Sequence, residues 1–345
     1  MLAEIYPRAH ARFASLPLLG PHLEGFVGWL CAQGYPRLPV RLRVRETPRL
    51  DARLYRSGIR RLEDVSAAQL LGFAPRDSQD DVYLAALVRS LARYLDERGM
   101  LTRPPVTPRE QLVAAYRAQL ERVRGLADST LTHHCATASA LLTFVAFDRT
   151  PAALHALGPR QIEAFVRATG TRLGRASLQH VVAHLRSFLR FLASRDVVAR
   201  ELDTAIDTPR LYRGEQLPHS LPWETVRAFL AAIDRSTPMG RRDYAMFLLI
   251  TTYGLRSSEV AALRLDDIAW RAGRLQIPRP KAQTPLALPL TQEVGAALLD
   301  YLRHARLDQP CRHVFLRVRA PRGPLAPTAV TEAFQGWTRR GALPI

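Results

Sequence analysis

Apolar side chains recur along most of this chain at intervals of three and four residues, which predicts a mainly α-helical protein. The clearest stripe covers 175–194, and helices are also expected at 109–124, 129–147 and 159–168. Four helices of this size and order pack into a compact bundle. We therefore expect 104–202 to form one helical domain.

The same pattern divides the rest of the chain into three further segments. Helical stripes over Leu23–Leu30 and Leu84–Leu95 indicate a small N-terminal domain at 1–103, which ends at a proline-rich break. Residues 203–222 contain prolines and a glycine but no helical stripe, and we interpret them as a linker. Residues 223–345 then form a C-terminal domain that opens with an amphipathic helix.

The C-terminal domain is expected to combine helices with a small antiparallel sheet. Apolar residues alternate from Leu275 to Leu290 with the period of two that is typical of half-buried strands, which predicts a hairpin. Residues 314–316 predict a further short strand, and 327–340 predict a final helix capped by a threonine.

One junction in this domain places a charged side chain where two helices meet. An apolar helix runs into Gly254, a residue suited to the left-handed position that ends helices. A second helix starts at once, with Ser257 or Ser258 as its capping residue and Glu259 in its first turn. Arg256 therefore lies beside helix N-terminal amides, where a phosphate oxygen would be favoured.

Lys281 lies at the turn of the expected hairpin and is the only lysine among the 49 lysine and arginine residues. An amine can give a proton to a leaving oxygen, whereas an arginine guanidinium in a protein practically never does. A catalytic acid is thus one interpretation of Lys281. The other is a solvated side chain, because turns are the usual place of a lone charge.

The segment Tyr-Gly-Leu-Arg-Ser-Ser-Glu-Val at 253–260, together with Lys281, resembles the tyrosine recombinase, or phage integrase, family. The resemblance implies that Arg256 is the first catalytic arginine, Lys281 the general acid and Glu259 a structural support. It also implies that the four-helix domain is a SAM-like core-binding domain and that the C-terminal domain is an α+β catalytic domain. The N-terminal domain lies outside the resemblance, and we interpret it as an accessory domain.

The family also uses a His-x-x-Arg box and a tyrosine nucleophile, and neither follows Arg256 in these 345 residues. Tyr301 is the last tyrosine, and its helical spacing with apolar neighbours indicates a core position. We therefore expect an incomplete, C-terminally truncated catalytic domain that does not cleave DNA alone. Truncation would leave the apolar side of a helix at 291–307 and parts of Phe247–Tyr253 less covered than usual.

Three other interpretations remain open for a chain of this kind. A partner could complete the catalytic site in trans. The chain could be a non-catalytic DNA-binding regulator that competes with an intact recombinase. A generic helical nucleic-acid-binding protein would need neither Arg256 nor Lys281.

The charge of the whole chain gives evidence that is independent of this motif. The sequence contains 49 basic and 31 acidic residues, which give a net charge of +18. Coding bias can explain arginine in place of lysine, but it does not explain an excess of bases over acids. Double-stranded DNA is the natural polyanionic partner. The arginine run at 36–61 is either a DNA-facing surface or a solvated face. The candidate DNA-binding residues are Arg175, Arg186, Arg190, Arg210, Arg213 and Arg279.

Several classes of site and location are disfavoured by what the sequence lacks. No apolar run approaches a membrane span and no signal-peptide pattern opens the chain, so a cytoplasmic protein without membrane contact is expected. Cys31, Cys135 and Cys311 suggest neither a disulfide framework nor a metal site. The resemblance implies a 3′-phosphotyrosyl intermediate that stores the energy of the broken bond, so we expect no cofactor. It also implies DNA integration and site-specific recombination of a mobile element by recombinase subunits assembled on DNA.

Overall fold

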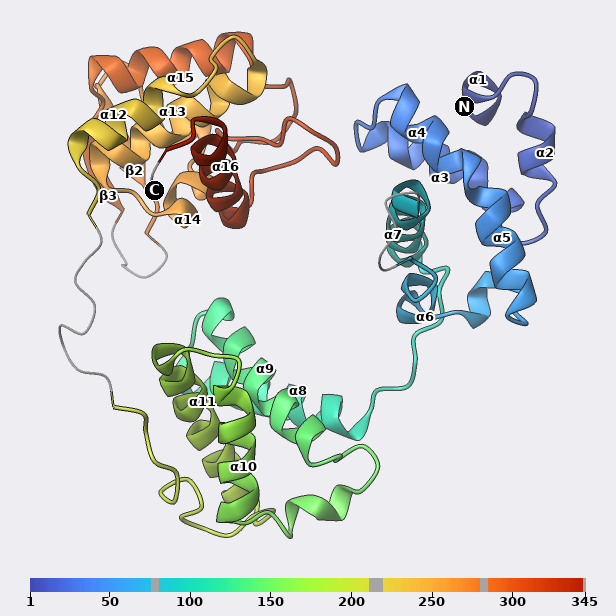
Figure 1. Cartoon of the computed structure of the whole chain (residues 1–345), viewed down its shortest axis with the longest axis vertical. Coiled ribbons are helices and arrows are strands. Elements are labelled where there is room, and N and C mark those ends of the chain that lie inside the picture. Colours follow the sequence, from blue (N-terminus) through green and yellow to red (C-terminus); the bar gives the residue numbers. More distant parts are fainter. Residues whose placement is uncertain (76–80, 211–219, 280–284, 344–345) are drawn as a thin grey trace. The chain divides into compact units, whose positions relative to one another are not determined.

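The structure is a computed structural model, and it describes residues 1–75, 81–210, 220–279 and 285–343 (Figure 1). The chain divides into two compact units, one formed by Pro104–Pro218 and the other by Met1–Arg103 together with His219–Ile345. Buried apolar side chains of the described residues gather in three clusters, each walled mainly by helices. The predicted mainly α-helical fold is therefore confirmed. Among the described helices, none combines the length and the apolar character that a membrane span requires.

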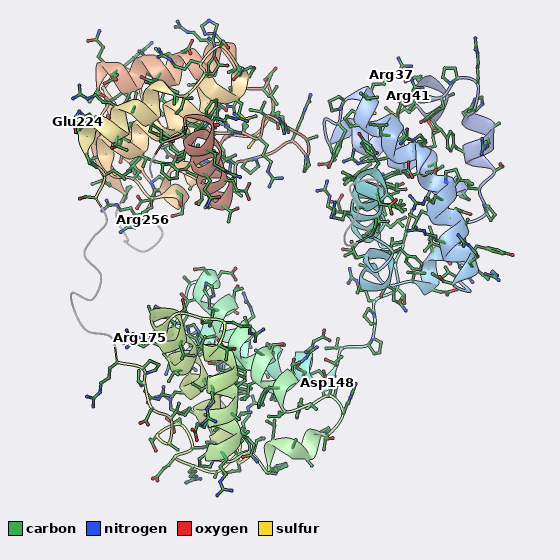
Figure 2. The ribbon with its side chains drawn as sticks, in the orientation of Figure 1. Arg37, Arg41, Asp148, Arg175, Glu224 and Arg256 are labelled. Atoms are coloured by element: carbon green, nitrogen blue, oxygen red, sulfur yellow. The ribbon has the colours of Figure 1, made fainter. Side chains whose placement is uncertain are left out.

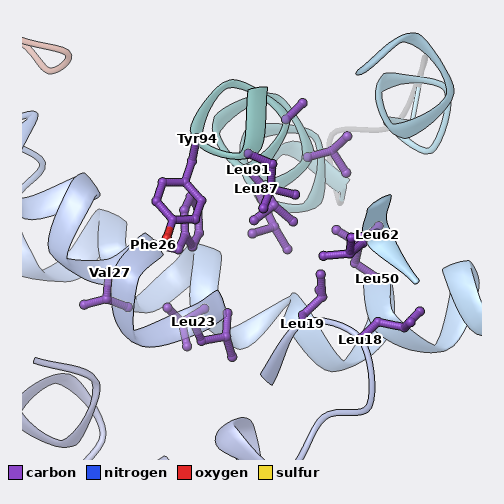
Figure 3. Packing of buried hydrophobic residues seen from close by; sticks show 14 of the residues in the cluster. Leu18, Leu19, Leu23, Phe26, Val27, Leu50, Leu62, Leu87, Leu91 and Tyr94 are labelled. Carbon is purple, nitrogen blue, oxygen red and sulfur yellow. The ribbon is translucent and has the colours of Figure 1, made fainter. Parts of the chain in front are cut away.

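The N-terminal helices pack around a core that the predicted stripes supply. Their bounds are α1 Leu2–Ile5, α2 His10–Ala14, α3 Gly20–Ala32, α4 Arg37–Arg45, α5 Thr47–Arg56, the 3-10 turn Leu62–Asp64, α6 Ala67–Leu71 and α7 Val82–Glu97. Phe26 of α3 is fully buried, and its ring centroid lies 5.6 Å from that of Tyr94 of α7 (Figure 3). The buried carboxylate of Asp51 accepts hydrogen bonds from the N–H groups of Leu18 and Leu19 at 3.0 and 2.8 Å. These bonds fasten α5 to the start of α3.

The second unit contains the four helices that the sequence predicts. Their bounds are α8 Pro108–Arg124, α9 Asp128–Phe144, α10 Pro159–Gly170 and α11 Arg175–Ala193, with a 3-10 turn at Pro151–Leu154. Helix α8 begins with a capping box, because Thr107 Oγ1 accepts from the Glu110 N–H while the Glu110 carboxylate accepts from the Thr107 N–H. It ends at Gly125, which has a left-handed φ of 55°. The cluster of buried side chains lies between α8, α9, α10 and α11.

Histidines from α9 and α11 meet beside this core. The Nδ1 atom of His134 lies 2.9 Å from the hydroxyl of the buried Tyr116, and the His134 ring lies 4.3 Å from that of His184. Burial, followed by the neighbouring imidazoles His134 and His133, lowers the pKa of His184 to about 4. No group of three or more potential metal ligands occurs among the described residues.

We expect His184→Gln to reduce the pH dependence of this unit's stability. Folding lowers the pKa of His184 from 6.5 to about 4, so the unfolded chain binds a proton first as the pH falls. The contribution of the neutral imidazole is complete above about pH 6.5 and is lost towards pH 4, by about 2 kcal/mol for this partly buried group. Hydrogen exchange of peptides from α11, corrected for intrinsic rates, measures the change. Equal acid sensitivity in the variant and the parent would contradict this expectation.

Residues 220–343 combine helices with a three-stranded antiparallel sheet of order β1-β2-β3. The bounds are α12 Trp223–Ala231, α13 Pro238–Tyr253, α14 Ser257–Ala262, the 3-10 turn Leu265–Asp267, β1 Ile268–Ala269, β2 Arg274–Ile277, β3 Leu286–Pro289, α15 Gln292–His304 and α16 Pro327–Arg340. Leu275 pairs with Leu288, and Ile277 pairs with Leu286. Leu275 and Ile277 are fully buried, so the period-two pattern and the predicted hairpin are confirmed.

Two expectations for this part of the chain are wrong. Residues 314–316 are buried but form no strand, because Leu316 makes only an isolated bridge to Pro324. Helix α16 has Ala326 at its N-cap and Pro327 at its first position, with no threonine side chain capping it. Of the positions expected to be less covered, Phe247, Val294, Leu298 and Tyr301 are each at most 4% exposed, whereas Ile250, Tyr253 and Leu302 are partly exposed, so the expected loss of cover stays a prediction.

Candidate phosphate-binding site

The helix junction that presents Arg256 is formed as the sequence predicts. Helix α13 ends at Gly254, whose φ of 64° lies in the left-handed region and whose N–H bonds to the carbonyl of Ile250. A residue with a Cβ would be strained at this angle, which explains the glycine. Arg256 then has extended backbone angles and forms the N-cap of α14. Its side chain is 75% exposed and lies at the surface of this part of the chain (Figure 2).

Glu259, rather than a serine, satisfies the start of α14. One carboxylate oxygen of Glu259 accepts from the Arg256 N–H at 2.9 Å, and the other accepts from Arg256 Nη1 at 3.0 Å. The prediction that Ser257 or Ser258 caps this helix is therefore wrong, because these serines occupy its first two positions. Glu259 is only 3% exposed, so a buried carboxylate holds the backbone and the side chain of an exposed arginine.

A second guanidinium lies close to the same carboxylate and belongs to Arg279, two residues after the end of β2. Its Nε atom lies 3.7 Å from Glu259 Oε1, and its side chain is 38% exposed. The Arg279 Nε atom is itself buried and has no hydrogen-bond partner among the described residues. The backbone N–H of Arg256 is the largest influence that lowers the pKa of Glu259, and the guanidinium groups of Arg256 and Arg279 lower it further, against the effect of burial. Glu259 therefore stays ionised at neutral pH.

The structure thus brings together Arg256, Glu259 and Arg279, which the sequence suggested separately. Glu259 was expected to be a structural support, and its two hydrogen bonds to Arg256 agree with that role. Its proximity to Arg279 was not anticipated, since the two residues are on different segments. The sequence gives only an indirect signal, because β2, which Arg279 follows, pairs with β1, and β1 lies shortly after the segment 253–260 that contains Arg256 and Glu259.

A tyrosine fastens the hairpin to the arginine junction. The Tyr253 hydroxyl donates to the Pro289 carbonyl at 2.7 Å and accepts from the Thr291 N–H at 3.2 Å. The end of α13 is thereby tied to the end of β3 and the start of α15. Lys281 lies between β2 and β3 in the sequence but outside the described residues, so its predicted role stays a prediction.

Four other candidate DNA-binding arginines, Arg175, Arg186, Arg190 and Arg210, belong to the unit Pro104–Pro218, whereas Arg256, Glu259 and Arg279 belong to the other unit. Arg186 donates to the carbonyl of Ile206, and Arg190 Nε lies 3.6 Å from Asp203 Oδ2, so both hold the segment after α11. Arg175 is the first residue of α11. Arg210 is exposed, whereas Arg213 lies outside the described residues. Their predicted contact with DNA stays untested.

Tyr301, the last tyrosine of the sequence, lies in the hydrophobic core. Tyr301 is 1% exposed, its ring stacks on Phe315 at 5.6 Å, and its hydroxyl accepts from the Leu316 N–H. Burial raises the pKa of Tyr301, which opposes formation of the phenolate. The prediction that Tyr301 is a core residue is confirmed.

Comparisons of sequence point to one group of proteins. A sequence profile described as the phage integrase family matches residues 220–343. The chain is 32% identical over 334 residues to a Sinorhizobium fredii protein named as an integrase/recombinase, and the match covers 93% of this chain and 80% of that protein. It is 28% identical over 195 residues to the tyrosine recombinase XerD of Lacticaseibacillus casei, which covers 56% of this chain and 65% of XerD.

Comparisons of structure agree at the level of the fold. The lambda integrase tetramer bound to a Holliday junction has a TM-score of 0.53 at 16% identity, over 79% of this chain and 75% of the integrase chain. The recombinase XerH, bound to its difH substrate, has a TM-score of 0.51 at 14% identity, over 70% of this chain and 83% of that one.

Proposed function

The chain belongs to the phage integrase family of tyrosine recombinases and has a role in DNA recombination, and on this premise we propose that it binds duplex DNA and holds a backbone phosphate with Arg256. The observation that carries the proposal is the exposed guanidinium of Arg256, which the buried Glu259 holds at 3.0 Å. The relatives that are named as integrases support a role in the integration of a mobile element.

The Arg256 guanidinium is positioned for phosphate binding in advance, because the Glu259 carboxylate already holds it. Glu259 uses one oxygen for Arg256 Nη1, which leaves the remaining donors of an exposed group free for a phosphate oxygen. Arg279, 3.7 Å from the same carboxylate, adds positive charge. A donor that is positioned in advance stabilises the charge of a transition state more than a mobile one does.

The chemistry we propose for the family site is transfer of a phosphoryl group to a tyrosine. The hydroxyl of a tyrosine loses its proton to solvent as its oxygen forms a bond to phosphorus, the bond from phosphorus to the 5′ oxygen breaks, and the departing 5′ oxygen takes a proton. We propose that Lys281 is the general acid that donates this proton, because its amine can lose a proton whereas a guanidinium practically cannot. Arg256 stabilises the charge on the non-bridging oxygens.

The polypeptide of residues 1–345 supplies the phosphate contact and the acid, but we propose that it does not cleave DNA by itself. Tyr301 is buried in the core, and the hydroxyl of Tyr253 is engaged in two hydrogen bonds to the backbone. A tyrosine from another recombinase subunit on the same DNA would complete the reaction. The solved relatives that form a tetramer or a substrate complex on DNA support such an assembly.

We expect Arg256→Gln to weaken binding of duplex DNA about tenfold and to reduce the slope of log affinity against log salt concentration by about one. The substitution removes one charge and a fixed contact to a phosphate. Fluorescence anisotropy over a series of salt concentrations measures both quantities. Arg312→Gln is the matched control, because it removes the same charge from another exposed arginine of residues 220–343 that also pairs with a carboxylate, that of Asp266. Equal effects of the two substitutions would argue against the proposed contact.

A suicide substrate, in which a nicked strand traps the covalent intermediate, tests whether the same protein preparation cleaves DNA. The parent chain should bind this DNA and form no covalent adduct when it is the only protein present. An adduct would overturn the proposal that the chain does not cleave alone, and mapping it would identify the tyrosine. Failure of the parent chain to bind duplex DNA at any salt concentration would overturn the proposed function as a whole.

A further inference from the structure

Three arginines line a small cavity in the N-terminal helices, far along the sequence from Arg256. The cavity has a volume of about 240 Å³ and lies between the segment that joins α1 to α2 and one side of α4. Arg8 comes from the joining segment, while Arg37 and Arg41 come from α4. All three side chains belong to exposed residues, so the cavity is accessible.

Arg37 and Arg41 lie on the same side of α4 because they are four residues apart, and Figure 2 shows the two labels next to each other. Arg37 Nη2 donates to the carbonyl of Glu4 at 2.8 Å. The guanidinium of Arg41 lies 5.1 Å from the centroid of the Tyr6 ring, and the Tyr6 hydroxyl donates to the Arg41 carbonyl at 2.8 Å. Both guanidinium groups are therefore held in place without an acidic partner.

The charges of this cluster are not neutralised by the described part of the chain. Neither Arg8, Arg37 nor Arg41 forms an ion pair with a described carboxylate. Two other arginines of residues 1–75 do have acidic partners, since Arg45 lies 3.2 Å from Glu46 and Arg61 pairs with Glu63. Like charges that line one cavity repel each other, and an anion that binds all of them removes this cost.

We propose that Arg8, Arg37 and Arg41 bind one backbone phosphate of duplex DNA, which gives the N-terminal helices a DNA contact of their own. The proposal rests on the proposed function, because it takes the ligand from the DNA on which that function acts. Arginine guanidinium groups bind phosphate oxygens through paired hydrogen bonds. The Tyr6 ring is already covered by Arg41, so the cavity presents charge to a phosphate rather than a bare ring to a base.

The test uses the full chain and a long duplex of random sequence. The double variant Arg37→Gln with Arg41→Gln should bind about tenfold more weakly, and the slope of log affinity against log salt should fall by about 0.9 for the lost phosphate contact. The control is Arg45→Gln with Arg61→Gln, which removes the same charge from residues 1–75 at arginines that already pair with Glu46 and Glu63. It should change the affinity less than twofold.

Two further variants separate binding from folding. Arg8→Gln removes an exposed side chain that makes no described hydrogen bond, and it should weaken binding about threefold while the helix content is unchanged. Arg41→Lys keeps the charge and should keep most of the salt slope. If the double variant and Arg8→Gln bind as the control does, while Arg256→Gln still weakens binding, this inference is overturned and the proposed function stands.

Discussion

Asp243→Ala should lower the free energy of unfolding of residues 220–343 by about 3–5 kcal/mol. Asp243 is 1% exposed, and its Oδ1 atom accepts from the Nε of Arg242 at 2.8 Å. Its Oδ2 atom accepts from the indole N–H of Trp337 at 2.9 Å, which joins α13 to α16. Removal of the carboxylate leaves Arg242, itself 7% exposed, as a buried charge without its partner.

Asp300→Ala is the matched control for this substitution. Asp300 also pairs with an arginine of α13, since Arg241 Nη1 lies 2.8 Å from Asp300 Oδ1, but the two side chains are 29% and 43% exposed. A loss of less than about 1 kcal/mol is expected from such a pair. Urea unfolding followed by tryptophan fluorescence compares the two variants. Similar losses of unfolding free energy in the two variants would show that the burial of Asp243 does not determine how much its carboxylate contributes to stability.

Glu259→Gln is expected to lower the free energy of unfolding by about 2–3 kcal/mol at neutral pH, because it leaves Arg256 and Arg279 without the charge between them. Folding lowers the pKa of Glu259 from its ordinary value of 4.5. The stabilisation by its carboxylate is therefore present above about pH 4.5 and is lost as the pH falls through the lower folded value. The difference between parent and variant should shrink in that acidic range.

Urea unfolding over a pH series measures this difference directly. Glu332→Gln is the matched control, because Glu332 is an exposed residue of α16 that makes no described ion pair, and its loss should stay within about 0.5 kcal/mol. A difference for Glu259→Gln that stays constant down to the most acidic condition would contradict the role of its charge. Glu259→Gln should also weaken DNA binding, as Arg256→Gln does, because the Arg256 guanidinium loses the carboxylate that holds it in position.

Features that depend on local spacing were predictable from the sequence. The stripes that became α3, α7 and α11 each place apolar residues on one side of a helix, and those residues are buried. Gly254 ends its helix because few other residues adopt a left-handed φ at low cost, so the position of Arg256 followed from its neighbours. The hairpin followed from strict alternation.

Features that depend on long-range packing were not predictable in the same way. Asp243 and Trp337 are separated by 94 residues and are joined by a hydrogen bond between α13 and α16, so no local pattern in the sequence indicates their contact. Residues 314–316 have strand-like composition but lack a neighbouring strand, so only isolated bridges form. Ser257 and Ser258 are good capping residues in isolation, yet Glu259 reaches back one turn to take that role.

The position of Glu259 between two arginines has a consequence for how this surface can change in evolution. Arg256 comes from a helix junction and Arg279 from the end of a strand, yet both lie against one buried acid. A neutral residue at 259 would leave two cations facing each other, so it should become tolerable only in relatives that have also lost the arginine at 279. The residues at positions 259 and 279 should therefore covary among relatives.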